Sequence, residues 1–454
     1  MPSTSSSVPV HIVGGGLAGS EAAWQLGSRG IPVVLHEMRP VRKTEAHETD
    51  QLAELVCSNT LGSKMPHTAP GIFKEELRLL GSLVVSSGWA AHVPAGGALA
   101  VDRDRFSVAI TGALENLGCV TICREEVMDL PGPEGPRTIL ATGPLTAPTL
   151  SEKLRALAGD DDLYFYDAIA PIVNVESVDH EIGYWGNRYE EDSDGDYFNL
   201  PMNKDEYEAF IDALTSGECT ASKNFEEERF FAGCQPIEAI ASKGRESLRF
   251  GPMKPVGLRD PRTGRRPWAV VQLRRETQTG AAMNMVGFQT KLKYGEQGRI
   301  FRLIPGLADA EFLRLGSVHR NTFVNAPRIL DRSLRLKCAP HISMAGQIVG
   351  CEGYTESSAM GLWAALSIVA EREGRELPPP PTTSMFGALL DYLAGADTSN
   401  FQPMNVNFGL LPPDTVRVKK KFKKARRIER GQACVAALEE WAQEHGLLHE
   451  APSG

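Results

Sequence analysis

The first forty residues alternate between short apolar runs and polar or glycine-rich segments. Apolar runs at 9–13 and 31–37 flank the glycine-rich segment 14–19 and a stretch of helical composition that ends at Gly30. Short β-branched runs bounded by turn residues are typical of buried strands, and the stretch between them is long enough for a helix. The pattern predicts strand, turn, helix and strand, which is how a parallel α/β sheet begins.

Two further segments extend this pattern, and they lie far apart in the chain. Residues 137–144 have the pattern of a strand and a turn, and residues 341–373 that of a strand, a glycine-rich turn and a long helix. Between about 165 and 325 the alternation fades, and acidic and aromatic residues crowd 184–201. We therefore expect an α/β fold whose Rossmann-like nucleotide-binding domain is assembled from both ends of the chain.

An inserted α+β domain would interrupt the nucleotide-binding domain, and a small C-terminal helical region would follow the prolines at 378–381. The predicted division is 1–165 for the first part of the nucleotide-binding domain, 166–330 for the inserted substrate domain, and 331–454 for the second part with the C-terminal basic helical region.

Composition narrows the class of protein. Hydrophobic residues make up 42% of the 454 residues and charged residues 23%, as in ordinary globular proteins. We expect no membrane segment, because no window approaches roughly 20 apolar residues, and no secretory signal, because no basic segment precedes the first apolar run. The eight cysteines lack the spacing of zinc sites or of a disulfide framework. These features predict a cytoplasmic protein without a bound metal.

The net charge of −9 is unevenly distributed. Residues 417–430 hold nine Lys/Arg and one Glu, a local charge of +8, so the rest of the chain carries −17. Such a basic stretch on an acidic body is typical of a polyanion-binding surface, and a solvated helix face explains the charge pattern equally well. The candidate phosphate-binding residues, with Phe422 among them, are Lys419, Lys420, Lys421, Lys423, Lys424, Arg426 and Arg427.

The glycine-rich segment has the spacing of a dinucleotide-binding turn. Gly14, Gly16 and Gly19 follow a predicted strand and open a predicted helix, and Glu37 ends the next strand. The first glycine permits the tight turn, the second the approach of a pyrophosphate, and the third close packing of helix on strand. An acidic residue at Glu37 suits ribose hydroxyls and disfavours the 2′-phosphate of NADP in this pocket.

FAD and NAD share this spacing, and the later segments favour FAD. The turn at 141–143 resembles the flavoprotein pattern in which the chain returns to the nucleotide, and the run 346–353 resembles the segment that meets the flavin end. The predicted nucleotide-binding residues are Gly14, Gly15, Gly16, Leu17, Ala18, Gly19, Glu37, Ala141, Thr142, Gly143, Gly346, Gln347 and Gly353.

Two cysteines stand in unusual local sequences. Cys234 precedes Pro236 and a short predicted helix that ends at Gly244, so its thiol is expected at a helix N-terminus, where the pKa of a thiol falls. Residues 48–57 are expected to form a helix with Cys57 near its end, where the dipole disfavours a thiolate. Taken singly, each cysteine is more often a packing residue than a catalytic one.

Seven motifs in order along residues 14–361 carry a resemblance that covers nearly the whole chain. They are GGGLAGSEAAWQL, LHEMRP, ELVCSNTLGSK, AVDRDRFS, GCQPIE, VHRNTF and AGQIVGCEGYTESSAMG. Together they resemble the TrmFO family of folate- and FAD-dependent tRNA methyltransferases, and ELVCSN and GCQPIE are specific to that family. The last motif is shared with the related GidA/MnmG family, which modifies wobble uridines.

The resemblance implies formation of 5-methyluridine at position 54 of the tRNA T-loop. Methylenetetrahydrofolate would supply the carbon, and FADH⁻, reduced by NADH or NADPH, the reducing equivalents. It assigns attack on uracil carbon 6 to Cys234 and leaves Cys57 as a proton acceptor or a guard of the flavin. Candidate folate-binding residues are His319, Arg320 and Asn321, although a structural role for the histidine is about equally expected.

Two other classes of function stay open at this point. An MnmG-like enzyme would use the same cofactors with a partner protein, but the chain is shorter than that family and carries ELVCSN. A flavin oxidoreductase of small molecules would need neither the basic stretch nor GCQPIE. The leading interpretation is a tRNA methyltransferase with no obligate protein partner.

Overall fold

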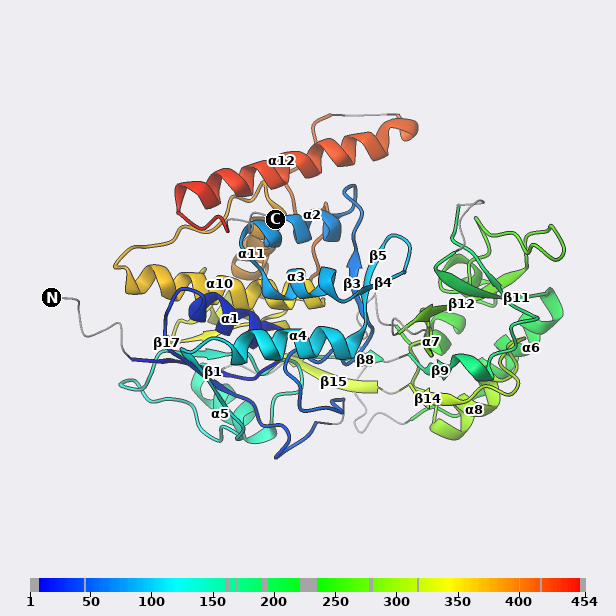
Figure 1. The fold of residues 1–454 in the computed structure, drawn as a ribbon, viewed down its shortest axis with the longest axis horizontal. Coiled ribbons are helices and arrows are strands. Elements are labelled where there is room, and N and C mark those ends of the chain that lie inside the picture. The colour runs from blue at the N-terminus through cyan, green and yellow to red at the C-terminus, as the bar shows by residue number, and fades with distance from the viewer. Residues whose placement is uncertain are drawn as a thin grey trace.

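The computed structural model describes residues 8–44, 46–159, 163–168, 170–189, 195–220, 235–276, 281–316, 318–399, 401–416 and 419–449. Two sheets, each with its own apolar core, organise these residues. In Figure 1 they form two lobes, with the early and late parts of the chain in one and the middle of the chain in the other.

The first sheet is Rossmann-like and takes strands from both ends of the chain. Five strands are parallel, and β16 adds an antiparallel edge. The order is β16 (Arg335–Leu336), β17 (Ala339–Met344), β7 (Thr138–Leu140), β1 (Val10–Val13), β2 (Val33–His36) and β6 (Val120–Cys123). The expected α/β fold with a Rossmann-like domain built from both ends of the chain is therefore confirmed.

Helices α1 (Leu17–Gly27) and α10 (Tyr354–Arg372) pack tightly against each other over this sheet. A Cβ atom added to Gly361 would lie 2.0 Å from the carbonyl oxygen of Ala18, so the close approach requires glycine. The other helices of this lobe are α2 (Ala69–Leu79), α3 (Leu83–Ala90), α4 (Arg103–Glu115), α5 (Pro148–Ala158), α9 (Ala326–Ile329) and α11 (Met385–Gly395). The contact between α1 and α10 brings the two distant halves of the nucleotide-binding domain together.

The second sheet is antiparallel and lies in the middle of the chain. Its order is β10 (Tyr184–Trp185), β11 (Tyr197–Met202), β12 (Ala269–Arg275), β13 (Ala282–Met285), β9 (Ile172–Asn174) and β14 (Phe312–Arg314). Helices α6 (Lys204–Ser216), α7 (Ile237–Ala241) and α8 (Tyr294–Phe301) belong to the same lobe. This is the expected inserted α+β domain.

A two-stranded antiparallel ribbon connects the lobes. Strand β8 (Leu163–Ala168) leads from the first lobe and pairs with β15 (Val318–Phe323), which returns to it. The predicted boundaries near 165 and 330 stay a prediction. A third, small sheet joins β3 (Thr60–Ser63), β5 (Ala98–Val101) and β4 (His92–Val93).

Helix α12 (Lys423–Glu444) runs across the outside of the first lobe. Its second half packs through the buried residues Cys434, Leu438 and Trp441, whereas its first half carries the basic residues. Among the described residues, no helix combines the length and the apolar character that crossing a bilayer requires.

One expected element is absent. Residues 48–57 form turns and irregular backbone rather than a helix. The N–H of Ala53 donates to the carbonyl of Gly15 at 2.9 Å, and the N–H of Leu52 donates to Thr111 Oγ1 at 3.0 Å. Ala53 has a φ of 52°, outside the helical region. Tertiary hydrogen bonds thus replace the local helical ones, and the expected helix end at Cys57 is wrong.

Candidate active site

The glycine-rich turn has the geometry that a dinucleotide requires. Gly14 ends β1 with a φ of 105°, and a Cβ there would lie 2.4 Å from the carbonyl oxygen of Ala141. A Cβ on Gly19 would lie 1.8 Å from the carbonyl oxygen of Gly14. At Gly16, the N-cap of α1, an added Cβ would meet no atom within 4 Å. The turn is therefore closed toward the sheet and open at the helix N-terminus, where phosphates bind.

Glu37 is buried beside this turn as a carboxylate. Burial disfavours its charge, but hydrogen bonds from Arg39 and from the N–H of Gly15 outweigh burial and hold the pKa of Glu37 below its usual value. The N–H of Gly15 lies 2.9 Å from Oε2, and Arg39 Nε lies 2.9 Å from Oε1. A carboxylate has about four acceptor positions, so capacity remains for a ribose hydroxyl. Glu37, Gly14, Gly16 and Thr142 line one pocket.

The other predicted nucleotide-binding residues lie around this turn. Gly143 has a φ of 68° and Gly346 a φ of 88°. A Cβ added to Gly346 would lie 2.9 Å from the Cβ of Ala18. Gly353 is the N-cap of α10, with a φ of 117°. The remaining ones are Leu17 and Ala18 in the first turn of α1, Ala141 after β7, and Gln347 in the 3₁₀ turn Gln347–Val349. The residues present fit FAD, whose phosphates would lie at the open N-terminus of α1.

Cys57 lies at the N-terminus of α10, next to the Gly353 turn. The hydroxyl of Tyr354 accepts hydrogen bonds from the N–H of Cys57 at 2.8 Å and from the N–H of Ser58 at 3.2 Å. Burial and the neighbouring Cys57 thiol raise the pKa of Tyr354. The structure thus joins two motifs that are 297 residues apart in the chain.

A buried ion pair holds the same loop from the other side. Arg103, the first residue of α4, donates to the carbonyl oxygens of Leu55 and Cys57, the latter at 3.2 Å. Its Nε donates to Glu276 Oε2 at 2.7 Å, and the two side chains are 17% and 4% exposed. Glu276 directly follows β12 of the inserted domain. The Cys57 loop is therefore fastened to both lobes.

Asn59 reinforces this connection. Its Nδ2 donates to the carbonyl oxygens of Val101 at 3.1 Å and Arg275 at 3.0 Å, and its Oδ1 accepts from Arg274 Nη2 at 2.7 Å. Asn59 and Arg274 are buried. Each bond is favourable mainly because a buried amide or guanidinium without a partner would be costly.

Cys234 lies outside the described residues, so its prediction stays a prediction. Helix α7 begins three residues later with Pro236 as its N-cap and spans five residues. Glu238 is buried and accepts from the N–H of Lys291 and from Thr290 Oγ1, and burial raises its pKa. This helix is shorter than the stretch ending at Gly244 that the sequence predicts.

The folate candidates lie on the ribbon between the lobes. In strand β15 the backbone of His319 pairs with Asp167, that of Arg320 with Tyr166 and that of Asn321 with Phe165. The ribbon ends near the 3₁₀ turn at Gln347–Val349, where the N–H of Val324 donates to the carbonyl of Ile348. The backbone of these candidates therefore lies between the nucleotide turn and the inserted domain.

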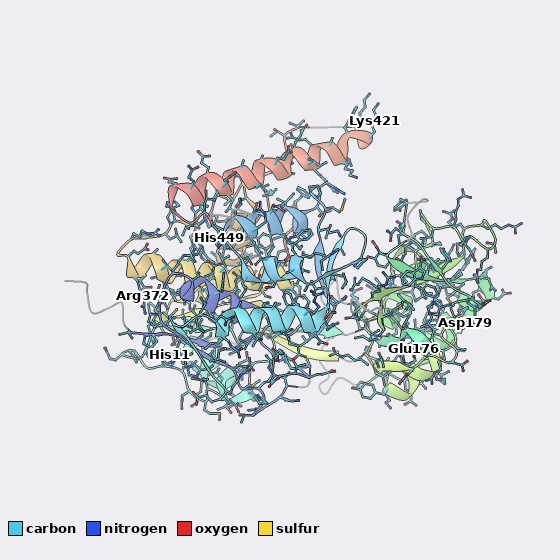
Figure 2. The ribbon with its side chains drawn as sticks, in the orientation of Figure 1. His11, Glu176, Asp179, Arg372, Lys421 and His449 are labelled. Atoms are coloured by element: carbon cyan, nitrogen blue, oxygen red, sulfur yellow. The ribbon has the colours of Figure 1, made fainter. Side chains whose placement is uncertain are left out.

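The basic residues before and within α12 lie away from the nucleotide turn. Lys421 projects from the end of the helix in Figure 2, and Phe422 is 51% exposed. Arg426 pairs with Asp414 at 2.8 Å and with Glu429 at 3.0 Å. Among the described residues, Lys419, Lys421, Lys423, Lys424 and Arg427 form no ion pair with a carboxylate. Positive charge at a helix N-terminus opposes the helix dipole, which indicates a use other than stability.

Sequence reasoning missed Tyr354, Arg103, Asn59 and Glu276. Three of them lie within the quoted motifs, where they stood without a role. Glu276 lies in no quoted motif, and its contact with Arg103 spans 173 residues of sequence. No local pattern identifies which acid will pair with a buried arginine.

Comparison with known proteins decides the family. The family model described as glucose inhibited division protein A matches residues 9–376. The methylenetetrahydrofolate–tRNA-(uracil-5-)-methyltransferase TrmFO of Paramagnetospirillum magneticum is 54% identical over 411 residues, which is 90% of this chain and 92% of that protein. The chain belongs to the TrmFO family. The TrmFO protein of Maricaulis maris is 50% identical over 453 residues, 95% of this chain and 97% of that protein.

The TrmFO-family fold also matches a solved structure of its wider group. Aquifex aeolicus GidA superposes with a TM-score of 0.71 at 16% identity, covering 99% of this chain and 75% of that chain. At this identity the likeness shows the fold alone. It agrees with the Rossmann-like lobe and the inserted lobe described above.

Proposed function

We propose that this protein is a methylenetetrahydrofolate-dependent tRNA (uracil-5-)-methyltransferase that forms 5-methyluridine at position 54 of the T-loop. The observation that carries the proposal is the identity of 54% to a TrmFO protein over 90% of the chain. The Cys57 loop supports it, because Tyr354 and Arg103 hold its backbone and the N–H of Ala53 in the same segment donates to Gly15 of the nucleotide turn. Cytoplasmic location, NADH or NADPH as reductant, and action without a protein partner belong to the same proposal.

FAD would be held by residues from both halves of the first lobe. The N-termini of α1 and α10 would bind its phosphate and flavin ends, and Glu37 would bind the adenosine ribose. When bound and reduced, FAD supplies the two electrons that turn a methylene group into a methyl group. Tyr354 and Arg103 hold the Cys57 backbone in place.

Cys234 acts on the uracil. Its thiolate adds to carbon 6, which makes carbon 5 nucleophilic enough to take the one-carbon unit of methylenetetrahydrofolate. Loss of the proton at carbon 5 expels tetrahydrofolate and leaves a methylene group on the ring. Addition of a hydride equivalent, which reduced FAD would supply, forms the methyl group as the thiolate departs from carbon 6. Cys57 either accepts that proton or protects the flavin. His319, Arg320 and Asn321 are the candidates for folate binding, and the basic residues at the start of α12 for tRNA phosphates.

The direct test is methylation of an unmodified tRNA transcript with labelled methylenetetrahydrofolate and NADH. Label is expected in 5-methyluridine, and Cys234→Ala is expected to lose this product while retaining FAD. Absence of label from 5-methyluridine with the wild-type protein would refute the proposal. Label at a wobble uridine would instead indicate MnmG-like chemistry.

The two roles of Cys57 can be separated with tRNA tritiated at uracil carbon 5. If Cys57 accepts the proton, Cys57→Ala loses tritium release while its flavin spectrum stays as in the wild type. If Cys57 protects the flavin, tritium release persists and reduced flavin oxidises faster in air.

A further inference from the structure

Tyr189, in the inserted domain, is held in a conformation that exposes its ring. Its φ is 67°, in the left-handed region that a tyrosine seldom adopts. Its N–H donates to the carbonyl of Gly257 at 2.9 Å, and a Cβ added to Gly257 would lie 2.8 Å from the Tyr189 ring. The residue is nevertheless 68% exposed. The Tyr189 ring lies against Gly257, and most of the tyrosine is in solvent. Backbone strain such as this positive φ is concentrated at functional sites.

Positive charge surrounds this ring. Lys254 Nζ donates to the Tyr189 hydroxyl at 3.3 Å and lies 6.0 Å from the ring centroid. Arg266 lines the depression beside Tyr189, together with Trp185, Asn187 and Arg259. Residues 243–266 contain eight Lys/Arg and two acidic residues, a net charge of +6. This second basic segment was not recognised from the sequence.

Part of this charge is not used within the described protein. Arg262 pairs with Asp260 at 2.8 Å, and Arg245 pairs with Asp212 at 2.6 Å. Arg265 and Arg266 are exposed, and no carboxylate of the described residues pairs with either of them. Phe250 in the same segment is 82% exposed. Residues 190–194, four of which are acidic, follow Tyr189 and lie outside the described residues.

We propose that Tyr189, Lys254, Arg265 and Arg266 form an RNA-binding surface, the Tyr189 platform, on which an unpaired base of the tRNA stacks. Aromatic rings flanked by Lys/Arg bind single-stranded nucleic acid, since every base offers a π-face and each phosphate attracts a cation. The inference rests on the proposed function for the identity of the RNA. It adds a binding site on the inserted domain, separate from α12.

The platform contacts a part of the RNA other than the reacting base. Strand β12 runs from the platform to the Cys57 loop. Near its start, the N–H of Val270 donates to the carbonyl of Met253, which is next to Lys254. After its end, Glu276 contacts Arg103. Six residues of strand span about 20 Å. A base on the platform is therefore a different nucleotide from a base at the Cys57 loop.

The test is the affinity for unmodified tRNA, measured between 50 and 200 mM salt. Tyr189→Ala is expected to bind about ten-fold more weakly, and Tyr189→Phe to bind normally. Replacing Arg265 and Arg266 together by Gln should lower the slope of log K against log salt by about 1.5. Tyr294→Ala is the matched control, because Tyr294 is 64% exposed on α8 of the same lobe. Replacing Lys293 and Arg299 by Gln is the control for charge.

Folding is checked independently with Tyr189→Gly, which suits a positive φ and should show the same loss of affinity with unchanged thermal unfolding. Tyr189→Ala and Tyr189→Gly proteins that bind tRNA as tightly as Tyr294→Ala would overturn the platform. The platform would also be overturned if replacing Arg265 and Arg266 by Gln left the slope of log K against log salt unchanged. That result is expected if the acidic residues 190–194 neutralise the two arginines. Methylation by the wild-type protein is measured in parallel, so failure of the platform and failure of the proposed function give different results.

Discussion

Arg103 and Glu276 join the two lobes of the protein at the loop that carries Cys57. Arg103 Nε and Glu276 Oε2 lie 2.7 Å apart with little exposure to solvent, while the same guanidinium donates to the carbonyl of Cys57. The partners come from α4 of one lobe and from the end of β12 of the other. One side chain thus couples the position of the inserted domain to the position of the candidate catalytic loop.

Removing one partner of this pair should be more damaging than removing a surface charge. Glu276→Gln leaves a buried guanidinium without its counter-ion, which costs about 3–5 kcal/mol when nothing compensates. We expect lower thermal stability and a lower kcat for methylation. Glu296→Gln, which removes a partner of Arg299 on α8, is the control and should change stability by less than about 1 kcal/mol. A Glu276→Gln protein with wild-type stability and kcat would show that the pair has no positioning role.

Tyr354→Phe tests the hydroxyl that accepts two N–H groups of the Cys57 loop. Without it, the N–H groups of Cys57 and Ser58 lose a buried acceptor, at about 1–3 kcal/mol each. We expect kcat to fall at least about ten-fold while the KM for tRNA changes little. Tyr392→Phe removes a hydroxyl that donates to the carbonyl of Gln402 and not to the Cys57 loop, and it should leave kcat unchanged. A shift in KM alone would contradict the assignment.

Two glycine variants should separate folding from nucleotide binding. Gly19→Ala places a methyl group 1.8 Å from the carbonyl oxygen of Gly14, so we expect a destabilised protein that does not retain FAD. Gly16→Ala meets no protein atom within 4 Å and keeps an allowed φ of −74°. It should fold normally and lose FAD, because the methyl group occupies the approach of the pyrophosphate. Thermal unfolding and the flavin absorbance of the purified proteins measure the two effects, and normal FAD retention by Gly16→Ala would contradict the phosphate site.

His47 should make stability depend on pH. Burial, together with the nearby charge of Arg39, lowers the pKa of His47 to about 4. In the unfolded chain it titrates near 6.5, so between about pH 6.5 and 4 the unfolded state binds more protons and folding weakens as pH falls. His47→Gln should therefore lose less stability than the wild type over this range. Parallel melting curves at pH 7 and pH 5 test this, and equal losses in both proteins would place the pKa of His47 near its ordinary value.

The α12 candidates predict a salt-dependent contribution to tRNA affinity. Replacing Lys423, Lys424 and Arg427 by Gln should weaken binding by a similar factor for every tRNA sequence, since phosphate contacts select no base. Replacing Glu439 and Glu440 by Gln on the distal half of the same helix is the control for altered helix charge. Unchanged affinity in the triple variant would leave the basic stretch as a solvated helix face.

Local sequence specified the nucleotide turn well. As the spacing predicts, Gly14 has a positive φ, Gly16 leaves space at the start of α1, and Gly19 lies against Gly14. These features depend mainly on backbone geometry within a few residues. The parallel strands at both ends of the chain were identifiable for the same reason, since strand and turn patterns are written in consecutive residues. The family followed from ordered motifs that extend over most of the chain.

Other features depend on contacts between distant residues. Residues 48–57 have a helical pattern but lie in an irregular loop, because Gly15 and Thr111 take the N–H groups that a helix would use. The Tyr189 platform needs Gly257 to accept the N–H of Tyr189 and to admit its ring, and no local pattern shows that pairing.

The sequence by itself determined the nucleotide-binding turn, the assembly of its domain from both chain ends and the family with its two cysteines. Only the tertiary structure decided which groups hold the Cys57 loop: Tyr354 and Arg103 from the first lobe, with Glu276 from the inserted lobe as the partner of Arg103. The physical reason is that a turn is stabilised by its own backbone conformation. A buried polar group is stabilised by whichever partner the fold brings within hydrogen-bonding distance.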